Sequence, residues 1–412
     1  MTDLPTAPQV KDASAGRAFE GADAAFRRNP YPRYAELRDS STLQLSSDGL
    51  YVLTRHADVL AAVRDPRLSS NPRHRAGAAG RRGLNRLASA EEGPTSMLTS
   101  DPPDHTRLRR LANRAFTPRA VEALRPRVTQ LVDDLLDQAA EQETCDLMTA
   151  LAEPLPVMVI CDLLGVPSSD WDRFKPWSTA ITRTLDGDVP DEVVEAARPA
   201  VEGFVMYFAE LMGERRADPR DDLLSALIAA EAEGDKLSEG ELFSMIILLF
   251  VAGHETTTNL IGNGTLALMR HRDQFDALRA DPPLAAAATE ELLRYDSPVQ
   301  VTGRTATEPV DIAGITLEPG EGVVCGLAAA NRDPRWIEQP DALVLARGAG
   351  DHLSFSHGMH HCLGAPLARL EGQVVFDRLT QRFPNMELAD DDPPYREHFV
   401  LRGLAALPVA LP

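Results

Sequence analysis

The stretch from Phe355 to Gly364 holds the residues best suited to chemistry, and Cys362 is its centre. This cysteine stands directly before a predicted helix, where unpaired backbone N–H groups and the positive end of the helix dipole favour a thiolate. Such a sulfur can bind a soft metal or attack an electrophile. Gly358 and Gly364 would let the backbone turn tightly and approach a flat ligand, and Phe355 could shield the sulfur from water. A lone cysteine is usually a small buried hydrophobe, but here the spacing favours a functional thiolate.

The pattern Phe355-x-x-Gly358-x-x-x-Cys362-x-Gly364 resembles the haem-thiolate signature of the cytochrome P-450 monooxygenases. In that family the cysteine is the proximal ligand of the haem iron, and its thiolate favours cleavage of bound dioxygen. The resemblance therefore implies haem b as cofactor, with Cys362 on the iron. It also implies that Phe355, Gly358 and Gly364 contact the haem. Ser356 stands where the family usually has glycine, which affects the local loop geometry.

A second polar stretch, residues 252–257, interrupts an otherwise apolar helical run. Thr256 lies four residues after Ala252, so its hydroxyl can bond that carbonyl and open the helix locally, helped by Gly253. Taken alone, this is most often a threonine bonding back onto its own helix. The resemblance implies more, namely that Glu255 and Thr256 are the acid–alcohol pair that delivers protons to oxygen.

A charged pair at helical spacing follows, Glu291 and Arg294, and in isolation it would be a solvated contact worth about 0.2–0.5 kcal/mol. The pair matches the Glu-x-x-Arg element of the family and stands between the long helix and the cysteine loop. Arg347 matches the arginine that completes this network, although Ala342 and Val344 differ from the commoner polar residues nearby. The resemblance implies that the three residues support the haem loop structurally.

The two propionates of a haem require cationic or hydrogen-bonding partners when they are buried. His105 and Arg109 are four residues apart on one predicted helix, so they share a face. They match the propionate-binding pair of the family, and Arg304 and His360 match two further propionate partners. Each residue alone would be read as an ordinary surface charge, but all four occur in the order of the family.

Three other readings of the cysteine loop stay open at this point. A zinc site could use His357, His360, His361 and Cys362, but adjacent His361 and Cys362 would converge poorly on a tetrahedron. A hydrolase could use Cys362 as a nucleophile activated by a histidine. A non-catalytic haem-binding protein would need the cysteine but no proton relay. A further alternative keeps the haem-thiolate and assigns it an atypical oxidation, either oxidative coupling or a peroxide-driven reaction.

The composition is that of an ordinary globular protein of 412 residues, 43% hydrophobic and 25% charged. Its net charge of −20 argues against a nucleic-acid partner. Four well-separated cysteines and no apolar leader indicate free thiols and a cytoplasmic protein. The longest apolar run, residues 245–252, is far shorter than the roughly 20 residues that span a bilayer. We therefore expect a buried core helix and no membrane anchor.

The fold class expected is mainly α with small β-sheets, in one domain of residues 18–412 after a flexible tail of residues 1–17. A hairpin is predicted at 42–53, where Asp48 and Gly49 suit a type I′ turn, and residues 69–100 read as a lid. Ser238 and Glu241 form a capping box at the start of a long central helix that ends near Arg270. In a P-450-like fold the haem lies between this helix and the cysteine loop. Helices are predicted at 104–115, 119–142, 148–163, 191–215, 220–232 and 284–295, and short strands at 299–301, 310–312, 315–317 and 323–325.

The reaction implied by the resemblance is insertion of one atom of O2 into a hydrophobic small molecule, a secondary metabolite, by hydroxylation or epoxidation. No flavin or nicotinamide fingerprint is present, so electrons from NAD(P)H must arrive through an external ferredoxin reductase and ferredoxin. We expect the ferredoxin to dock on a basic run made of Arg107, Arg110, Arg114 and Arg119. We also expect a monomer. The family analogy places the substrate against the lid, the segment 177–185 and these residues: Leu248, Leu249, Ala252, Val299, Val301, Phe399 and Val400.

Overall fold

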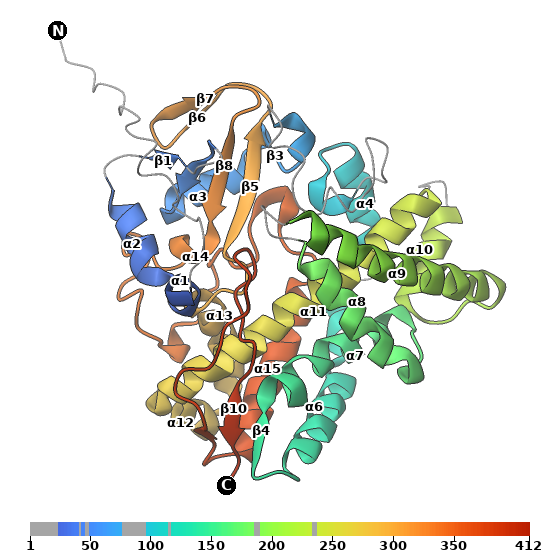
Figure 1. Ribbon diagram of the computed structural model, residues 1–412, viewed down its shortest axis with the longest axis vertical. Coiled ribbons are helices and arrows are strands. Elements are labelled where there is room, and N and C mark those ends of the chain that lie inside the picture. Colours follow the sequence, from blue (N-terminus) through green and yellow to red (C-terminus); the bar gives the residue numbers. More distant parts are fainter. Residues whose placement is uncertain are drawn as a thin grey trace.

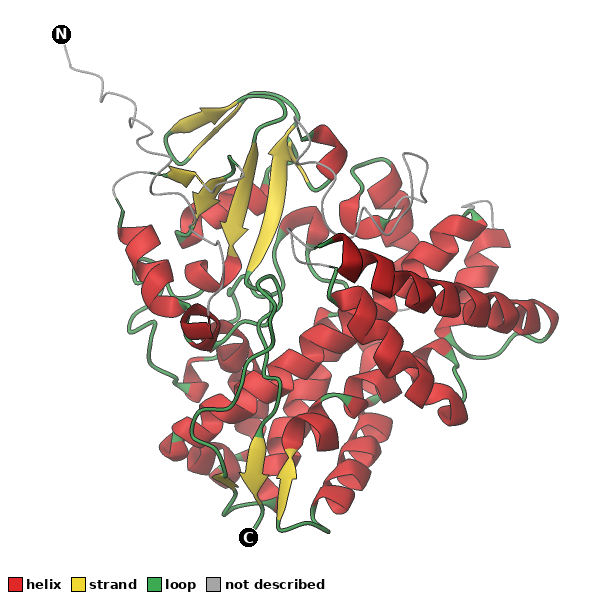
Figure 2. Cartoon of the chain, viewed as in Figure 1, coloured by secondary structure: helices red, strands yellow, loops and turns green. Residues whose placement is uncertain are grey.

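The computed structural model describes residues 24–40, 43–45, 49–75, 96–113, 117–184, 190–232 and 237–412. Helices fill one side of the molecule and a β-rich part lies on the other, as Figure 1 and Figure 2 show. The predicted tail and most of the predicted lid lie outside the described residues. The fold class predicted from the sequence, mainly α with small sheets, is confirmed.

Helices account for most of the described chain. Their bounds are α1 Ala24–Arg28, α2 Tyr31–Asp39, α3 His56–Arg64, α4 Asp104–Asn113, α5 Pro118–Ala123, α6 Arg125–Ala139, α7 Pro154–Leu164, α8 Phe174–Thr182, α9 Asp191–Ala217, α10 Leu223–Ala232, α11 Glu239–Arg270, α12 Arg272–Ala280, α13 Ala285–Tyr295, α14 Leu327–Ala330 and α15 Ala365–Arg382. The largest hydrophobic core lies among α6, α7, α9, α11 and α15.

The strands form three small sheets. Their bounds are β1 Gln44–Leu45, β2 Tyr51–Leu53, β3 Leu68–Ser69, β4 Thr144–Asp146, β5 Val301–Ala306, β6 Val310–Ile312, β7 Ile315–Leu317, β8 Gly322–Gly326, β9 Glu387–Leu388 and β10 Pro408–Ala410. The main sheet has the order β1-β2-β8-β5-β3, with β2 and β8 parallel and its other pairs antiparallel. The other two sheets are β4-β10-β9 and β6-β7.

Helix α11 runs through the middle of the helical part (Figure 1). It begins with the predicted capping box, because Ser238 Oγ accepts from Glu241 N at 3.2 Å and Glu241 Oε2 accepts from Ser238 N at 2.8 Å. Among the described residues α11 is the one helix long and apolar enough to cross a membrane, but 72% of its apolar window is buried inside the protein. It is therefore the buried core helix that the apolar run predicted.

Prolines account for the places where the predicted helices differ from the observed ones. The helix predicted at 119–142 is divided into α5 and α6, and Pro126 lies in the first turn of α6, where its missing N–H costs nothing. The helix predicted at 148–163 is a turn of π-helix, Met148–Ala152, followed by α7 from Pro154. The pattern also missed the short helices α1, α2, α3, α8, α12 and α14.

The predicted hairpin is present, since β1 pairs antiparallel with β2. Its register places Leu45 opposite Tyr51, so five residues separate the paired positions. A type I′ turn at 48–49 alone would leave only two residues between the paired positions, and the turn type stays a prediction. Gly49 does have a positive φ of 71°, and the residues from 46 to 48 lie outside the described chain.

Candidate functional site

The cysteine loop joins the short 3₁₀ helix Gly358–His360 to α15. Cys362 N donates to the carbonyl of Phe355 at 2.9 Å, and this bond closes the loop. The side chain of Cys362 is accessible, whereas the other three cysteines are buried; all four thiols are free, as predicted. The surrounding protein raises the pKa of the Cys362 thiol, while the N–H groups of Gly364 and Ala365 and the Arg109 guanidinium act in the opposite direction.

The glycines of this loop have the two roles that the sequence suggested. Gly358 has a φ of 70°, and a Cβ there would lie 2.6 Å from the carbonyl oxygen of Val63. No atom lies within 4 Å of the position that a Cβ would take at Gly364, so open space adjoins the backbone there. Ser356, which replaces the usual glycine, has a φ of 55° and a buried hydroxyl without a hydrogen-bond partner among the described residues.

Four cationic or ionisable groups converge next to this loop. The rings of His105, on α4, and His360 lie 4.3 Å apart between centroids, and neither Nε2 atom has a hydrogen-bond partner in the described chain. Burial lowers the pKa of His360 to about 3, and the positive fields of His105, Arg304 and Arg109 add to this effect. Arg304 is 5% exposed, and Arg109 is half-buried.

Neither Arg109 nor Arg304 forms an ion pair with a carboxylate within the described residues, although Arg304 is buried and Arg109 half-buried. Burial of unpaired cations is unfavourable without an anion. The four residues predicted to bind propionates therefore lie together and form an anion-binding cluster.

The middle of α11 carries the predicted polar stretch. Thr256 Oγ1 donates to the carbonyl of Ala252 at 2.6 Å, as expected from the spacing. The helix continues through these residues, so the predicted local opening does not interrupt it. Ala252 is exposed although α11 is otherwise mostly buried. His254 Nδ1 lies 2.8 Å from Ser178 Oγ of α8, which joins the two helices.

Glu255 is 2% exposed and pairs with Arg396, a residue that the sequence gave no reason to select. Arg396 also contacts Glu153 at 2.7 Å, and Glu153 contacts Lys175 at 2.5 Å. These side chains form a chain of alternating charges from the buried Glu255 to Lys175, which is 48% exposed. These paired side chains lie up to 243 residues apart in the sequence, so no local spacing could have identified them.

The three predicted support residues are in contact. Arg294 donates to both oxygens of Glu291, at 2.7 and 2.8 Å, and both side chains have no exposed surface. Arg347 Nε lies 3.4 Å from Glu291 Oε1. Arg294 and Arg347 also bind backbone carbonyls of the segment 331–342. The interpretation of this pair as a solvated surface contact is therefore excluded.

Two residues that the sequence did not single out connect α13 to the cysteine loop. Asn331 accepts from Leu353 N at 2.6 Å and donates to Ser354 Oγ at 2.8 Å. Ser354 Oγ in turn donates to the carbonyl of Leu293 at 2.7 Å. The start of the loop is thus hydrogen-bonded to the helix that carries Glu291.

The histidines near Cys362 do not form a zinc site. Within the described ranges, no three His, Cys, Asp or Glu side chains are placed to hold a metal ion together. The ring of His357 instead accepts from Arg64 of α3, with Nδ1 3.3 Å from Arg64 Nε. The zinc interpretation is therefore wrong.

The predicted substrate-contacting residues are only partly brought together. Gln300 N donates to the carbonyl of Val400 at 2.9 Å, and Val299 forms a β-bridge with Leu401, so Val299 and Val301 lie beside the segment 399–401. Leu249 is 7% exposed and belongs to the core, and Leu248 packs against it. The segment 177–185 is described only to residue 184.

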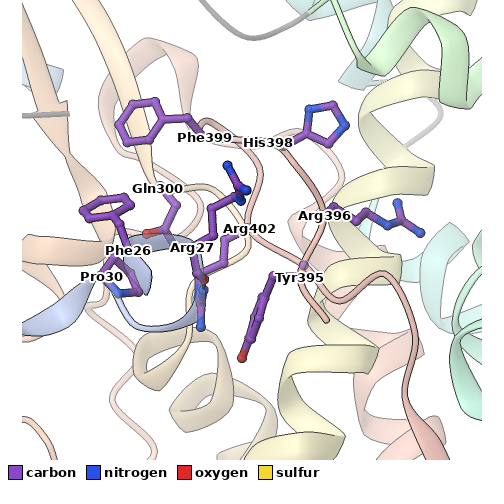
Figure 3. Close-up of a pocket in the computed structure, with 10 residues that line it drawn as sticks. Phe26, Arg27, Pro30, Gln300, Tyr395, Arg396, His398, Phe399 and Arg402 are labelled. Carbon is purple, nitrogen blue, oxygen red and sulfur yellow. Dashed lines mark hydrogen bonds between the residues drawn. The ribbon is translucent and has the colours of Figure 1, made fainter. Parts of the chain in front are cut away.

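A small cavity of about 10 Å³ lies between α1 and the segment 395–403, and its lining includes Phe399, Gln300 and Arg402 (Figure 3). This volume is enough for about one water molecule. The ring of Phe399 also lies against Phe26, with centroids 6.2 Å apart. The cavity is therefore too small to be a substrate pocket, and the assignment of Phe399 to substrate contact stays a prediction.

The basic run assigned to docking is only partly available. Arg107 donates to Glu241 at 3.3 Å and lies 3.6 Å from Asp104, so its charge is largely compensated. Arg114 lies outside the described residues. Arg110 and Arg119 are both exposed, and their role in docking stays a prediction.

Comparison with known proteins agrees with this arrangement of loop, helix and cation cluster. The family model described as "Cytochrome P450" matches residues 73–408. The chain belongs to the cytochrome P450 family and is an oxidoreductase of the monooxygenase type. This assignment replaces the hydrolase and the non-catalytic haem-binding interpretations.

Two curated relatives and one solved structure illustrate the similarity. The chain is 45% identical to "Vitamin D(3) 25-hydroxylase" of Pseudonocardia autotrophica over 394 residues, 94% of each chain. It is 40% identical to "Polyketide biosynthesis cytochrome P450 PksS" of Bacillus subtilis over 396 residues, 94% of this chain and 96% of the relative. The structure of P450BioI in complex with acyl carrier protein ligated to hexadec-9Z-enoic acid matches with a TM-score of 0.87 and 38% identity, covering 94% of this chain and 100% of that chain.

The family implies haem and dioxygen use, and the residues present fit a haem. The buried Arg304 and the half-buried Arg109 form no ion pair with a carboxylate in the described chain, so both are available to a group that carries two carboxylates. Open space adjoins Gly364, where a flat group could approach the backbone. Cys362 is the accessible cysteine and stands before the first turn of α15, which suits a thiolate ligand.

Proposed function

We propose that this chain is a haem-thiolate monooxygenase that inserts one oxygen atom from O2 into an apolar small molecule, by hydroxylation or epoxidation. The observation that carries the proposal is the joint placement of an accessible cysteine and four buried or half-buried cationic or ionisable groups without an ion-paired carboxylate in the described chain. Together they match the thiolate ligand and the propionate partners of one haem. When bound, haem supplies dioxygen activation and oxygen-atom transfer.

In this proposal the loop residues bind and orient the haem. Cys362 holds the iron, and His105, Arg109, Arg304 and His360 bind the propionates. Gly364 would leave room for a flat group, and Gly358 allows the tight turn. The carbonyl of Phe355 accepts the backbone N–H of Cys362, and its ring would shield the sulfur. Glu291, Arg294 and Arg347 fix the segment 331–342, which is hydrogen-bonded to the loop through Asn331.

Glu255 and Thr256 are the proposed source of protons. The hydroxyl of Thr256 is held by the carbonyl of Ala252, next to an exposed part of α11. Glu255 is held away from water by Arg396. The charged chain through Arg396 and Glu153 links Glu255 to Lys175, which is partly exposed. Because an arginine does not give up its proton, this chain positions Glu255 and does not itself conduct protons.

The proposed substrate is an apolar secondary metabolite. The relatives named above are a vitamin D hydroxylase, a polyketide-biosynthesis enzyme and a P450 bound to a fatty acyl carrier protein, which supports a hydrophobic molecule. Ala252 is exposed, and the segments 299–301 and 399–400, which lie beside each other, are mainly apolar. We propose that residues 18–412 form one domain that acts as a cytoplasmic monomer, and that a ferredoxin and its reductase pass electrons from NAD(P)H.

The deciding experiment is the visible spectrum of the purified protein, reduced and exposed to carbon monoxide. Thiolate-ligated haem gives a red-shifted Soret band that histidine-ligated haem lacks. Cys362→Ser should lose this band and abolish turnover, whereas Cys145→Ser, a change in strand β4, should retain both. A folded protein that takes up no haem would refute the proposal. Turnover with peroxide but not with reduced ferredoxin would favour the peroxide-driven alternative.

A further inference from the structure

An ion pair lies directly behind the phenylalanine of the cysteine loop. Arg369 of α15 donates to both carboxylate oxygens of Glu290, with Nε–Oε1 at 2.7 Å and Nη2–Oε2 at 3.0 Å. The guanidinium carbon of Arg369 lies 4.6 Å from the centroid of the Phe355 ring. The side chains of Arg369 and Glu290 are 30% and 15% exposed. Arg369 is therefore a cation fixed against the ring by a bidentate partner.

Arg369 is connected to Cys362 through the Phe355 ring and through the backbone of the loop and α15. The carbonyl of Phe355 accepts the backbone N–H of Cys362 at 2.9 Å. Arg369 follows Cys362 by seven residues and lies about one helical turn after Ala365, the first residue of α15. His352, which has no exposed side-chain surface, places its Nε2 atom 3.3 Å from Glu290 Oε2 and contacts the same ring with centroids 5.7 Å apart. The ring, the ion pair and the cysteine backbone thus form one packed unit.

We propose that Arg369 and Glu290 are positioning residues that set the reduction potential of the iron bound to Cys362, with opposite signs. This inference rests on the proposed function, since it requires Cys362 to be the iron ligand. Reduction of a ferric haem adds one negative charge to the haem and its sulfur ligand. A nearby cation stabilises that charge and a nearby carboxylate destabilises it. Arg369 therefore favours the ferrous state, and Glu290 moderates this effect.

Two simpler roles predict different results. If the pair only joins α13 to α15, both single variants lose stability and their potentials do not move in opposite directions. If Arg369 only helps a redox partner to dock, its replacement slows electron transfer. The equilibrium potential, measured without that partner, then stays unchanged. An equilibrium measurement on the isolated protein separates the three roles.

The experiment is a redox titration of the haem-loaded protein with mediator dyes and without ferredoxin. Glu290→Gln should shift the one-electron equilibrium toward the ferrous form by several-fold, up to tenfold, which corresponds to 59 mV. Arg369→Gln should shift it toward the ferric form by a similar factor, and Arg369→Lys by less. Arg382→Gln is the matched control: it removes a charge from the same helix, about 20 Å farther along, where Arg382 pairs with Asp137, and should not move the potential.

Shifts of the same sign in Glu290→Gln and Arg369→Gln, or no shift in either, would overturn the inference. If Arg369→Gln does not retain haem, the isosteric Glu290→Gln decides alone: a shift toward the ferrous form supports the proposal, and any other result refutes it. A wild-type protein without the thiolate Soret band would refute the proposed function. A wild-type protein with that band and unmoved potentials in the variants would refute only this inference.

Discussion

Glu371 is a carboxyl group buried without compensation in α15. Its side chain is 2% exposed, and its Oε2 atom has no hydrogen-bond partner among the described residues. Burial raises the pKa of Glu371 to about 8, from 4.5 in the unfolded chain. As pH rises from about 4.5 to 8, the unfolded state loses this proton first, so the free energy of unfolding falls. The loss is complete above about pH 8 and reaches about 5 kcal/mol, since one pKa unit corresponds to about 1.4 kcal/mol.

Replacement of Glu371 by glutamine should remove this pH dependence. The amide needs hydrogen bonds of its own, so the absolute stability of Glu371→Gln includes a cost that does not change with pH. The difference in free energy of unfolding between variant and wild type should nevertheless change by about 3 kcal/mol in favour of the variant between pH 5 and pH 7.

Denaturant unfolding of the haem-loaded proteins at several pH values measures this difference. Both proteins release haem on unfolding, so that contribution cancels in the difference. Glu387→Gln, a change at an exposed position of β9, serves as the control and should give a difference that is constant with pH. Parallel stability curves for wild type and Glu371→Gln would show that the carboxyl is compensated in the folded protein. A difference that grew toward acid pH would also refute the reasoning.

Three further changes test other parts of the site. Thr256→Ala should retain haem but uncouple reductant consumption from product formation, measured as product per NAD(P)H; equal coupling would show that the hydroxyl is not part of proton delivery. Ser356→Gly should raise the free energy of unfolding by about 1 kcal/mol, because glycine adopts the observed φ of 55° without strain and the unpartnered hydroxyl is removed; a decrease in thermal stability would contradict this. Glu291→Gln should lower the free energy of unfolding by about 3–5 kcal/mol, since it breaks a fully buried pair; a loss below about 1 kcal/mol in denaturant unfolding would show that the pair is dispensable.

The parts of the structure that could be predicted from the sequence depend on short spacings. The capping box at Ser238 sets the start of α11, because both of its hydrogen bonds join residues three apart. The contact of Thr256 with Ala252 follows from one helical turn, as does the bidentate pair of Glu291 and Arg294. A local pattern is enough when a helix brings the two partners together.

The resemblance to the family supplied what local spacing could not. His105, Arg304 and His360 are separated by far more than a helical turn, and only the order of the family motifs suggested that they would meet near one group. The structure brings them together because β5 places Arg304 in the main sheet beside β8, while α4 and the cysteine loop carry the two histidines. The same order also indicated Arg347, which contacts Glu291 despite unusual neighbours in the sequence.

Neither spacing nor resemblance indicated the two ion pairs that adjoin the site. Arg396 meets Glu255 across 141 residues, and Arg369 meets Glu290 across 79. With 42 basic and 62 acidic residues in the chain, the sequence offers many equally plausible partners for each charge. Only burial distinguishes them, because a charge that loses its hydration must find a partner within a few ångströms. The residues that control the charge near Cys362 and Glu255 are therefore set by the packing of α11, α13 and α15, and they become visible only once those helices are in place.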